Sequence, residues 1–225
     1  MGYGIKLHVW GDRACFTRPE MKAERVSYDV MTPSAARGIL EAIHWKPAIR
    51  WVVDRIHVLN EISFDSVRRN EIKNKISVSQ SQIKSAMNRR EVVLNQASAE
   101  ERQQRMTVML RNVAYIIEAH FEMTDSAGET DNPEKHYSIF SRRARQGQFY
   151  HQPYFGCREF PVNFELMEEE KSMPTSVYRN LPERDLQWML WDLEYRTEIS
   201  PKFFRAVMRE GVIDVPDLYQ REVRS

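Results

Sequence analysis

The sequence predicts an α+β protein: a ferredoxin-like (βαββαβ) N-terminal domain followed by a small antiparallel β extension. The first observation is the order of hydrophobic patterns, which runs strand, helix, strand, strand, helix, strand. The second is a series of short alternating segments after that order ends, separated by turn signals. With 225 residues, of which 42% are hydrophobic, the chain can bury a sizeable core. We therefore expect a ferredoxin-like domain over residues 1–150 and a β-rich part over residues 151–225.

The first strand and the first helix follow from local patterns. Residues 5–10 alternate between apolar and polar side chains, which predicts a strand. Thr32 and Pro33 are typical of a helix start. Apolar side chains at positions 36, 39, 40 and 43 then form one helical stripe, and Pro47 ends the helix.

The central strands enclose an insertion. Residues 49–59 are rich in β-branched and aromatic side chains, and residues 62–67 alternate, so both segments predict strands. Residues 68–105 are polar and basic with little periodicity, and we interpret them as an irregular insertion. Residues 106–123 recover strand character, with the odd-numbered positions from 115 to 121 on one face.

The second helix has its own start and stop signals. Asn132 can cap it, Pro133 suits its first position, and Gly147 follows its expected end at Arg145. The remaining segments with strand character are 160–166, 186–195, 203–208 and 212–215.

Charge is unevenly distributed along the chain, although the net charge is only +1. Residues 68–111 carry ten basic and four acidic side chains, and residues 135–158 carry five basic and none acidic. If the fold brings these blocks together, they make a phosphate-binding strip. Alternatively, neighbouring acidic segments neutralise them, and charge alone leaves both readings open.

Composition also excludes several classes of protein. No apolar run of about 18 residues is present, so no membrane span is expected. The N-terminal segment is too short and polar for a secretory signal, and we expect a cytoplasmic protein. Cys15 and Cys157 fit a reducing compartment and are not expected to pair, and no Cys/His cluster suggests a metal or another cofactor.

The start of the second helix is the first candidate site. Lys135 and His136 fall in its first turn, where free N–H groups and the helix dipole favour an anion. On its own, such a pair is more typical of a capped surface helix with solvated charges. The predicted topology adds a second group, because it brings the end of the first helix, with His44 and Lys46, to the same edge of the sheet.

Two histidines and two lysines at one edge suit metal-independent RNA cleavage. One imidazole would take the proton of a ribose 2′-hydroxyl, the other would protonate the leaving oxygen, and Lys135 would stabilise the charged phosphate. Helix dipoles should favour neutral His136 and charged His44, which suggests His136 as base and His44 as acid. The reverse assignment stays open, and His44 alone would read as a helix cap.

Other residues are candidates for RNA contacts. These are Tyr28, Lys46, Arg142, Arg143, Arg145 and Arg158. The aromatic segment 149–155 could stack on bases or form a hydrophobic hinge. Trp45 is expected in the core rather than as a stacking platform. Glu118, His120 and Glu122 share one strand face, where a polar surface is favoured over metal binding.

Ordered sequence matches over residues 9–160 carry a resemblance to a known family. They include Thr32-Pro33-Ser34-Ala35, Ile43-His44-Trp45-Lys46-Pro47, Lys135-His136-Tyr137-Ser138-Ile139 and Phe155-Gly156-Cys157-Arg158-Glu159-Phe160. Together they resemble the Cas five-d subunit of type I-C CRISPR systems, a member of the RAMP superfamily.

The resemblance implies an endoribonuclease that cuts CRISPR repeat hairpins in precursor transcripts without metal. It also implies that the protein stays bound to the 5′ tag, beside other subunits of the interference complex. The family's catalytic lysine and histidine correspond to Lys135 and His136. Its catalytic tyrosine falls at His44, where this chain departs from the pattern and Tyr28 could compensate.

Two other functions remain open from the sequence. A non-catalytic crRNA-binding subunit of the same complex would have the same fold and a site that binds without cutting. A metal-dependent nuclease, or a module that binds duplex DNA, would use the basic insertion instead.

Overall fold

The computed structural model describes residues 3–21, 23–73, 77–88, 91–92, 102–168, 173–195 and 199–217. The chain divides into two compact units. The larger unit comprises Met1–Asp65 and Val108–Ser225, and the smaller comprises Ser66–Thr107. The site described below lies within the larger unit.

An antiparallel sheet forms the framework of the larger unit. Its strands follow the order β6-β1-β5-β3-β9-β8-β7, and each neighbouring pair in that order is antiparallel. The strands are β1 (Gly4–Ala14), β3 (Ile49–Val58), β5 (Arg102–Met123), β6 (Asn163–Leu166), β7 (Arg184–Tyr195), β8 (Ile199–Arg209) and β9 (Val212–Asp214). A two-residue strand, β2 (Arg25–Val26), also pairs with β5. The predicted mixture of an antiparallel sheet with few helices is confirmed.

The two predicted helices are present with their predicted caps. In α1 (Pro33–Ile43), the Thr32 side chain accepts a hydrogen bond from the Ala35 amide. In α3 (Pro133–Arg145), the Asn132 side chain accepts one from the Lys135 amide at 2.8 Å. Gly147 follows α3 with a positive φ of 65°, a conformation in which glycine carries no Cβ penalty.

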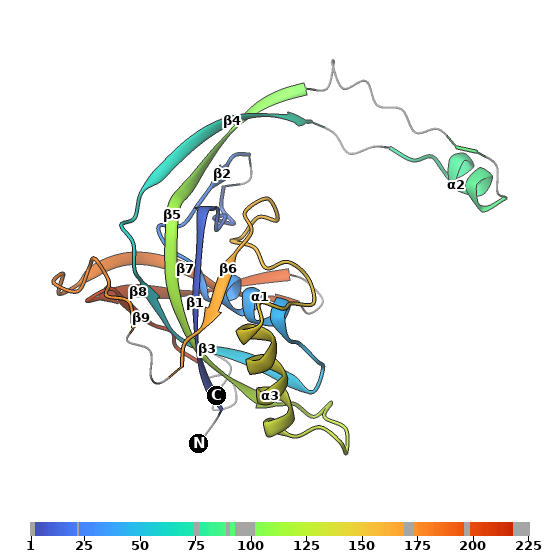
Figure 1. Ribbon diagram of the computed structural model, residues 1–225. Helices are drawn as coiled ribbons and strands as arrows, with labels where there is room; N and C mark the ends of the chain where they lie inside the picture. The colour runs from blue at the N-terminus through green and yellow to red at the C-terminus, as the bar shows by residue number, and fades with distance from the viewer. Residues whose placement is uncertain are drawn as a thin grey trace. The chain divides into compact units, whose positions relative to one another are not determined.

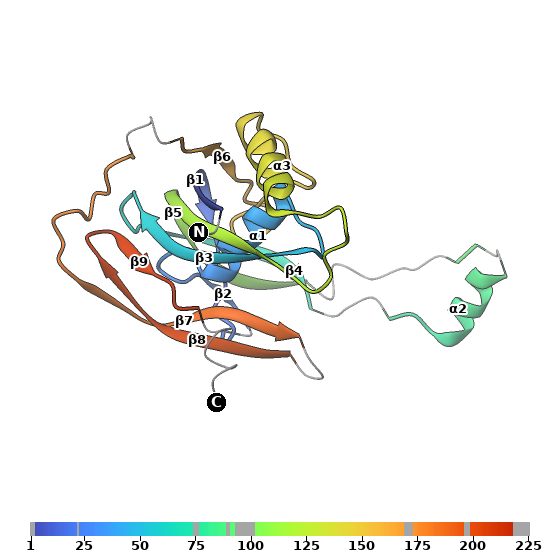
Figure 2. The same cartoon turned by 90° about the horizontal axis from the view of Figure 1, so that it is seen from below.

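Helices α1 and α3 lie side by side on one face of the sheet, as both views show (Figures 1 and 2). Alternation along β5 explains this face, because its odd-numbered side chains from Tyr115 to Phe121 are buried. Trp51 of β3 completes the packing, with its ring 5.3 Å from Phe121 and 4.8 Å from Phe140 of α3. The aromatic core therefore fixes α3 against the centre of the sheet.

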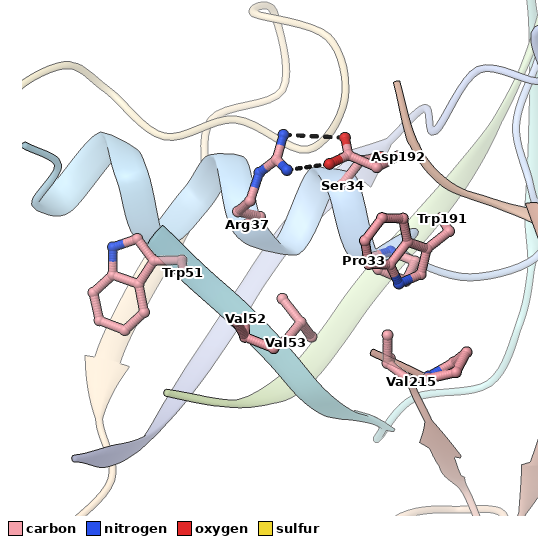
Figure 3. Close-up of a pocket in the computed structure, with 10 residues that line it drawn as sticks. Pro33, Ser34, Arg37, Trp51, Val52, Val53, Trp191, Asp192 and Val215 are labelled. Atoms are coloured by element: carbon pink, nitrogen blue, oxygen red, sulfur yellow. Dashed lines mark hydrogen bonds and ion pairs between the residues drawn. The ribbon is translucent and has the colours of Figure 1, made fainter. Parts of the chain in front are cut away.

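The C-terminal strands are tied to α1 by an ion pair. Figure 3 shows the Arg37 guanidinium of α1 meeting both carboxylate oxygens of Asp192 on β7, one of them at 3.0 Å. Beside this pair, Trp191 and Pro33 line a cavity of about 20 Å³. Such a volume holds about one water molecule, so this cavity is too small for a substrate.

The smaller unit contains more regular structure than the sequence indicates. Strand β4 (Phe64–Ile72) begins in the larger unit, continues into the smaller one and pairs with β5. Helix α2 (Gln80–Met87), which the sequence analysis did not predict, has a capping box between Ser79 and Gln82. It buries no residue, so it lacks the apolar stripe by which a helix is recognised. The remaining insertion residues, 74–76, 89–90 and 93–101, lie outside the described residues.

The two cysteines are neighbours, which the sequence did not predict. Cys157 Sγ lies 3.7 Å from the carbonyl oxygen of Cys15, and the two residues form no disulfide. A hydrogen bond between the two thiols, together with burial, raises the pKa of Cys15. Gly156 permits this approach, because a Cβ at that position would lie 2.0 Å from the Cys15 carbonyl oxygen. The fold therefore brings the two cysteines together without a disulfide between them.

Among the described residues, no helix has both the length and the apolar character that a membrane crossing requires.

Candidate active site

The end of α1 and the start of α3 bring two histidines into direct contact. His44 Nε2 lies 3.0 Å from His136 Nδ1, although the residues are 92 positions apart in the sequence. The ring centroids are 5.3 Å apart, and each side chain is at most 2% exposed. The predicted convergence of the two imidazoles is confirmed, and their burial was not predicted.

His44 is held by three contacts at the end of α1. Its backbone N–H bonds to Leu40, which makes it the C-cap of the helix. The Trp51 indole donates a hydrogen bond to the His44 carbonyl at 2.9 Å. One residue earlier, the Ile43 carbonyl accepts from Arg143 of α3 at 2.7 Å. These bonds satisfy carbonyls that the helix end leaves free and fix the His44 ring against α3.

His136 is held from the opposite side by the turn that precedes α3. Asp131 Oδ1 lies 3.3 Å from His136 Nε2 and 3.1 Å from Lys135 Nζ. The lysine also donates to the Thr130 carbonyl at 3.2 Å. Nε2 of His136 is buried and has no hydrogen bond among the described residues, because the approach of Asp131 is outside hydrogen-bond geometry. Because Nε2 is buried, a substrate can bond to it only after neighbouring side chains move.

The contact between the imidazoles restricts their protonation. A nitrogen–nitrogen distance of 3.0 Å requires one ring to donate and the other to accept, so one proton lies between them. If His44 Nε2 donates, neutral His136 carries its proton on Nε2, beside the Asp131 carboxylate. If His136 Nδ1 donates, the neutral His44 ring carries its proton on Nδ1. The pair can therefore pass a proton from one ring to the other.

Electrostatics keep His44 neutral at physiological pH. Burial, followed by repulsion from His136, Arg143 and Lys46, lowers the pKa of His44 to about 4. The prediction that the dipole of α1 favours charged His44 is therefore wrong. The cause is physical: desolvation and three nearby cationic or potentially cationic groups outweigh a partial charge at a helix end.

Asp131 interacts with both His136 and Lys135. Burial lowers the pKa of His136, and the Asp131 carboxylate opposes this effect. The hydrogen bond from Lys135 is the main cause of a lowered Asp131 pKa. Asp131 therefore remains ionised and stabilises a positive charge on His136.

The arginines predicted to bind RNA have different environments. Arg143 is committed to the end of α1, Arg145 pairs with Glu168 at 2.6 Å, and Arg142 contacts Gln148 at 3.2 Å. Arg158 is exposed in the turn that follows Gly156. Their RNA contacts stay predictions, with Arg143 already serving a structural purpose.

The lysines are more available. Lys46 is exposed, and it lies close enough to lower the pKa of both His44 and His136. The side chain of Lys135 is 43% exposed. Both lysines therefore act electrostatically on the imidazole pair, and the Lys135 ammonium is held by Asp131 and the Thr130 carbonyl.

Two aromatic predictions need revision. Tyr28 is 1% exposed and its ring lies 4.4 Å from the Arg18 guanidinium. Burial raises its pKa, and its side chain bonds to the Leu190 backbone. Its predicted RNA contact remains untested, and burial opposes it. Trp45, predicted to be in the core, is 53% exposed, because α3 packs against Trp51 instead.

The polar side chains of β5 form ion pairs on the face away from the helices. Glu118 pairs with Lys6 at 2.8 Å, His120 with Asp54 at 2.9 Å, and Glu122 with Arg50. Within the described residues, no three histidine, cysteine or acidic side chains are grouped as metal ligands. The polar-surface interpretation of this strand face agrees with these contacts.

Asp131 is the site residue that sequence reasoning missed. The available signal was its position, four residues before Lys135, since side chains four apart lie on the same side of a helix start. That signal is weak, because Asp131 precedes the cap and lies outside the helix.

Comparison with known proteins gives the family. A model of the family described as CRISPR-associated protein (Cas_Cas5) matches residues 4–216. The chain belongs to this family. It is 53% identical over 226 residues, covering 100% of both chains, to a Mannheimia succiniciproducens protein named CRISPR pre-crRNA endoribonuclease Cas5d. A Thermus thermophilus protein with the same name is 39% identical over 240 residues, covering 98% of this chain and 95% of that protein.

The family's fold is also found in a solved structure. The crystal structure of a CRISPR-associated protein superposes with a TM-score of 0.71 at 24% identity, covering 97% of this chain and 94% of the other. At this identity the likeness concerns the fold alone.

Proposed function

We propose that this protein is an endoribonuclease that cuts CRISPR repeat hairpins in precursor crRNA without metal. The observation that carries the proposal is the buried contact of 3.0 Å between His44 and His136, at the helix start that presents Lys135. Relatives that match the chain over its whole length are named pre-crRNA endoribonucleases, which supports the substrate class.

The proposed reaction is attack of a ribose 2′-oxygen on the adjacent phosphorus. The 2′-hydroxyl gives up its proton as the new oxygen–phosphorus bond forms. The bond from phosphorus to the 5′-oxygen breaks, and that oxygen receives a proton. The products are a 2′,3′-cyclic phosphate and a 5′-hydroxyl, so one proton is taken up and one is released.

The histidine pair supplies both proton transfers. Neutral His44, with its pKa lowered to about 4, accepts the 2′-hydroxyl proton. The proton between the rings moves to His136, whose unbonded Nε2 donates to the 5′-oxygen. Asp131 stabilises the positive charge that passes through His136. This reverses the acid and base roles expected from helix dipoles.

Lys135 supplies the electrostatic part. Its ammonium group lies on the helix start, where the free amides and the dipole of α3 favour an anion. We propose that it leaves Asp131 and binds the phosphate in the transition state. Lys46, Arg142, Arg145 and Arg158 would bind flanking phosphates of the RNA.

The proposal also covers the domain structure of the protein and the complex that it joins. We infer that β6, β1, β5 and β3, with α1 and α3, form the ferredoxin-like unit. This unit then extends past the expected boundary at residue 150 to the end of β6 at Leu166, and the β-rich part follows it. As in the family that the sequence resembles, the protein would keep the 5′ tag and join an interference complex in the cytoplasm. Duplex DNA would be a further partner.

A second candidate is a crRNA-binding subunit that does not cut. The observation in its favour is burial, since both rings are at most 2% exposed. Under the first candidate, RNA must move the exposed Lys46 and Lys135 side chains to reach the pair. Under the second, RNA binds these lysines and the imidazoles stay covered.

One experiment separates these functions. The cognate CRISPR repeat RNA is incubated with the protein in EDTA, and cleavage and binding are measured separately. We expect a cyclic-phosphate product, and Lys135→Ala should lower the cleavage rate by about 100-fold while it weakens binding only a few-fold.

Other outcomes select other functions. Tight binding of intact RNA would favour the non-catalytic subunit. Cleavage that appears only after Mg²⁺ or Mn²⁺ is added would favour a metal-dependent nuclease.

A further inference from the structure

Two large aromatic side chains are exposed at the end of α1. Trp45 is 53% exposed and Tyr150 is 84% exposed. Exposed aromatic rings forgo a large gain from burial, which for a side chain of this kind is about 1.5–3 kcal/mol. A large aromatic side chain can be buried in this region of the fold, since Trp51 is buried there.

Backbone contacts hold the two residues on a shared platform. The Tyr150 amide donates to the Ala42 carbonyl of α1 at 2.8 Å. Ala42 lies two residues before His44, and Trp45 is the residue directly after His44. Both exposed rings therefore emerge within about one helical turn of the imidazole pair.

The segment that carries Tyr150 is fixed at its other end too. The Gln148 amide donates to the Arg143 carbonyl at 2.8 Å, and the Gln148 side chain accepts from Arg142 at 3.2 Å. Arg143 in turn bonds to Ile43 of α1. Tyr150 is thus presented by a braced turn between the two helices that form the site.

The surrounding charge favours a nucleic acid as the occupant. Lys46 is exposed beside Trp45, and Lys135 is exposed at the start of α3. Proteins that bind single-stranded nucleic acid combine cationic groups, which track the backbone, with aromatic rings on which bases stack. An apolar protein partner would have to desolvate these lysines, which makes it the poorer match.

We propose that Trp45 and Tyr150 form a stacking site for unpaired RNA bases next to the phosphate bound at His44 and His136. This inference rests on the proposed function, because it names how the RNA is held at that site. Stacking on either side of the phosphate orients the ribose whose 2′-hydroxyl is attacked. It also selects unpaired nucleotides, since bases within a duplex already stack on each other.

The test uses a short RNA that is not a cleavage substrate. A fluorescein-labelled oligoadenylate of eight nucleotides is titrated with the whole protein at low salt, and binding is followed by anisotropy. Trp45→Ala and Tyr150→Ala should each weaken binding about 5- to 100-fold, because stacking contributes about 1–3 kcal/mol per base. Trp45→Phe and Tyr150→Phe should retain most of the affinity, since they keep a ring.

Trp188 provides a matched control. It is a tryptophan on β7, 63% exposed, and outside the proposed machinery. Trp188→Ala should leave binding unchanged. Equal weakening by Trp45→Ala and Trp188→Ala, or no weakening by either alanine variant at the site, would overturn the stacking site.

A spectroscopic readout distinguishes stacking from a structural effect. With 2-aminopurine at the central position, wild-type protein should quench the emission, and Trp45→Ala should restore it at saturating protein. Unchanged quenching in both alanine variants, with their melting temperatures unaltered, would contradict the proposal. So would self-association of the wild type that Trp45→Ala abolishes without any oligoadenylate binding.

Cleavage of the repeat RNA keeps the two proposals separate. If the wild type cuts the repeat and the alanine variants cut and bind like it, the stacking site fails alone. If the wild type does not cut but Trp45→Ala weakens oligoadenylate binding, the nuclease fails while the base-binding site stands.

Discussion

Four of the described histidines occupy two contrasting settings. On the polar face of the sheet, His57 Nε2 lies 3.0 Å from Glu118, and His120 Nδ1 lies 2.9 Å from Asp54. Between the helices, His44 faces another imidazole, His136, at 3.0 Å. A carboxylate partner supplies the charge that a protonated ring needs, whereas an imidazole partner competes for the same proton.

The difference separates a structural pair from a reactive one. Burial lowers the pKa of His57, but Glu118 compensates in part, and the pair is one link in a chain of surface charges. The His44 pair has no carboxylate in hydrogen-bond geometry among the described residues, and Asp131 reaches only the far nitrogen of His136. In the first arrangement each ring faces an oxygen acceptor, whereas in the second either ring can donate or accept the shared proton.

Replacing one histidine in each setting should give the largest expected difference in the rate of RNA cleavage. His136→Gln should lower the rate of repeat-RNA cleavage by about 100- to 10,000-fold, the usual contribution of general acid–base catalysis. His57→Gln should change the rate only a few-fold. Single-turnover cleavage in EDTA measures both, with melting temperatures as the folding control. Equal losses in the two variants would contradict the distinction between the pairs.

Removing the charge of Asp131 should shift the pH dependence of cleavage. Asp131 raises the pKa of His136, so Asp131→Asn lowers it further. The acidic limb of the pH–rate profile should then move to lower pH, and the plateau rate should fall about tenfold as the His136 charge loses its partner. Asp54→Asn serves as the matched variant. A limb that moves up, or the same shift in both variants, would show that Asp131 does not act on the pair.

Stability should also depend on pH through His44. Its pKa is about 4 in the folded chain against an ordinary 6.5. The unfolded chain therefore binds more protons between these values, and the stability that neutral His44 provides is lost as pH falls through that window. Between pH 7 and pH 5, the wild type should lose about 2 kcal/mol more than His44→Gln. Urea unfolding at both pH values checks this, and equal losses would contradict the buried, neutral ring.

Breaking a carboxylate pair on the sheet should have the smallest effect. His120 and Asp54 are 30% and 44% exposed, and exposed ion pairs contribute about 0–1 kcal/mol. Asp54→Asn should therefore change the free energy of unfolding by less than about 1 kcal/mol, and this change should shrink in high salt. A loss of several kcal/mol, insensitive to salt, would show that the sheet pair matters as much as the helix pair.

Local signals allowed much of the fold to be predicted. The caps at Thr32 and Asn132 fixed the starts of both main helices, and alternation along β5 identified the face that they cover. These features depend on neighbours within a few residues, so the sequence contains them directly. Helix α2 was not predicted because it buries no residue and so has no periodic apolar stripe.

The candidate site was predicted only in part for the opposite reason. The order of elements was enough to bring His44 and His136 to one sheet edge. The exposure of Trp45 and the commitment of Arg143 to the end of α1 depend on how Trp51 and Phe140 fill the core. No local pattern encodes which of several aromatic residues packs and which stays in water.

The sequence by itself determined which elements form, in what order, and therefore which residues meet. Only the tertiary structure decided the environment of these residues and therefore their protonation. It buried both imidazoles, set one against the other, and placed Asp131 behind His136. The charge of a titratable ring depends on how much water and which charges surround it, and those surroundings exist only once segments 92 residues apart have packed together.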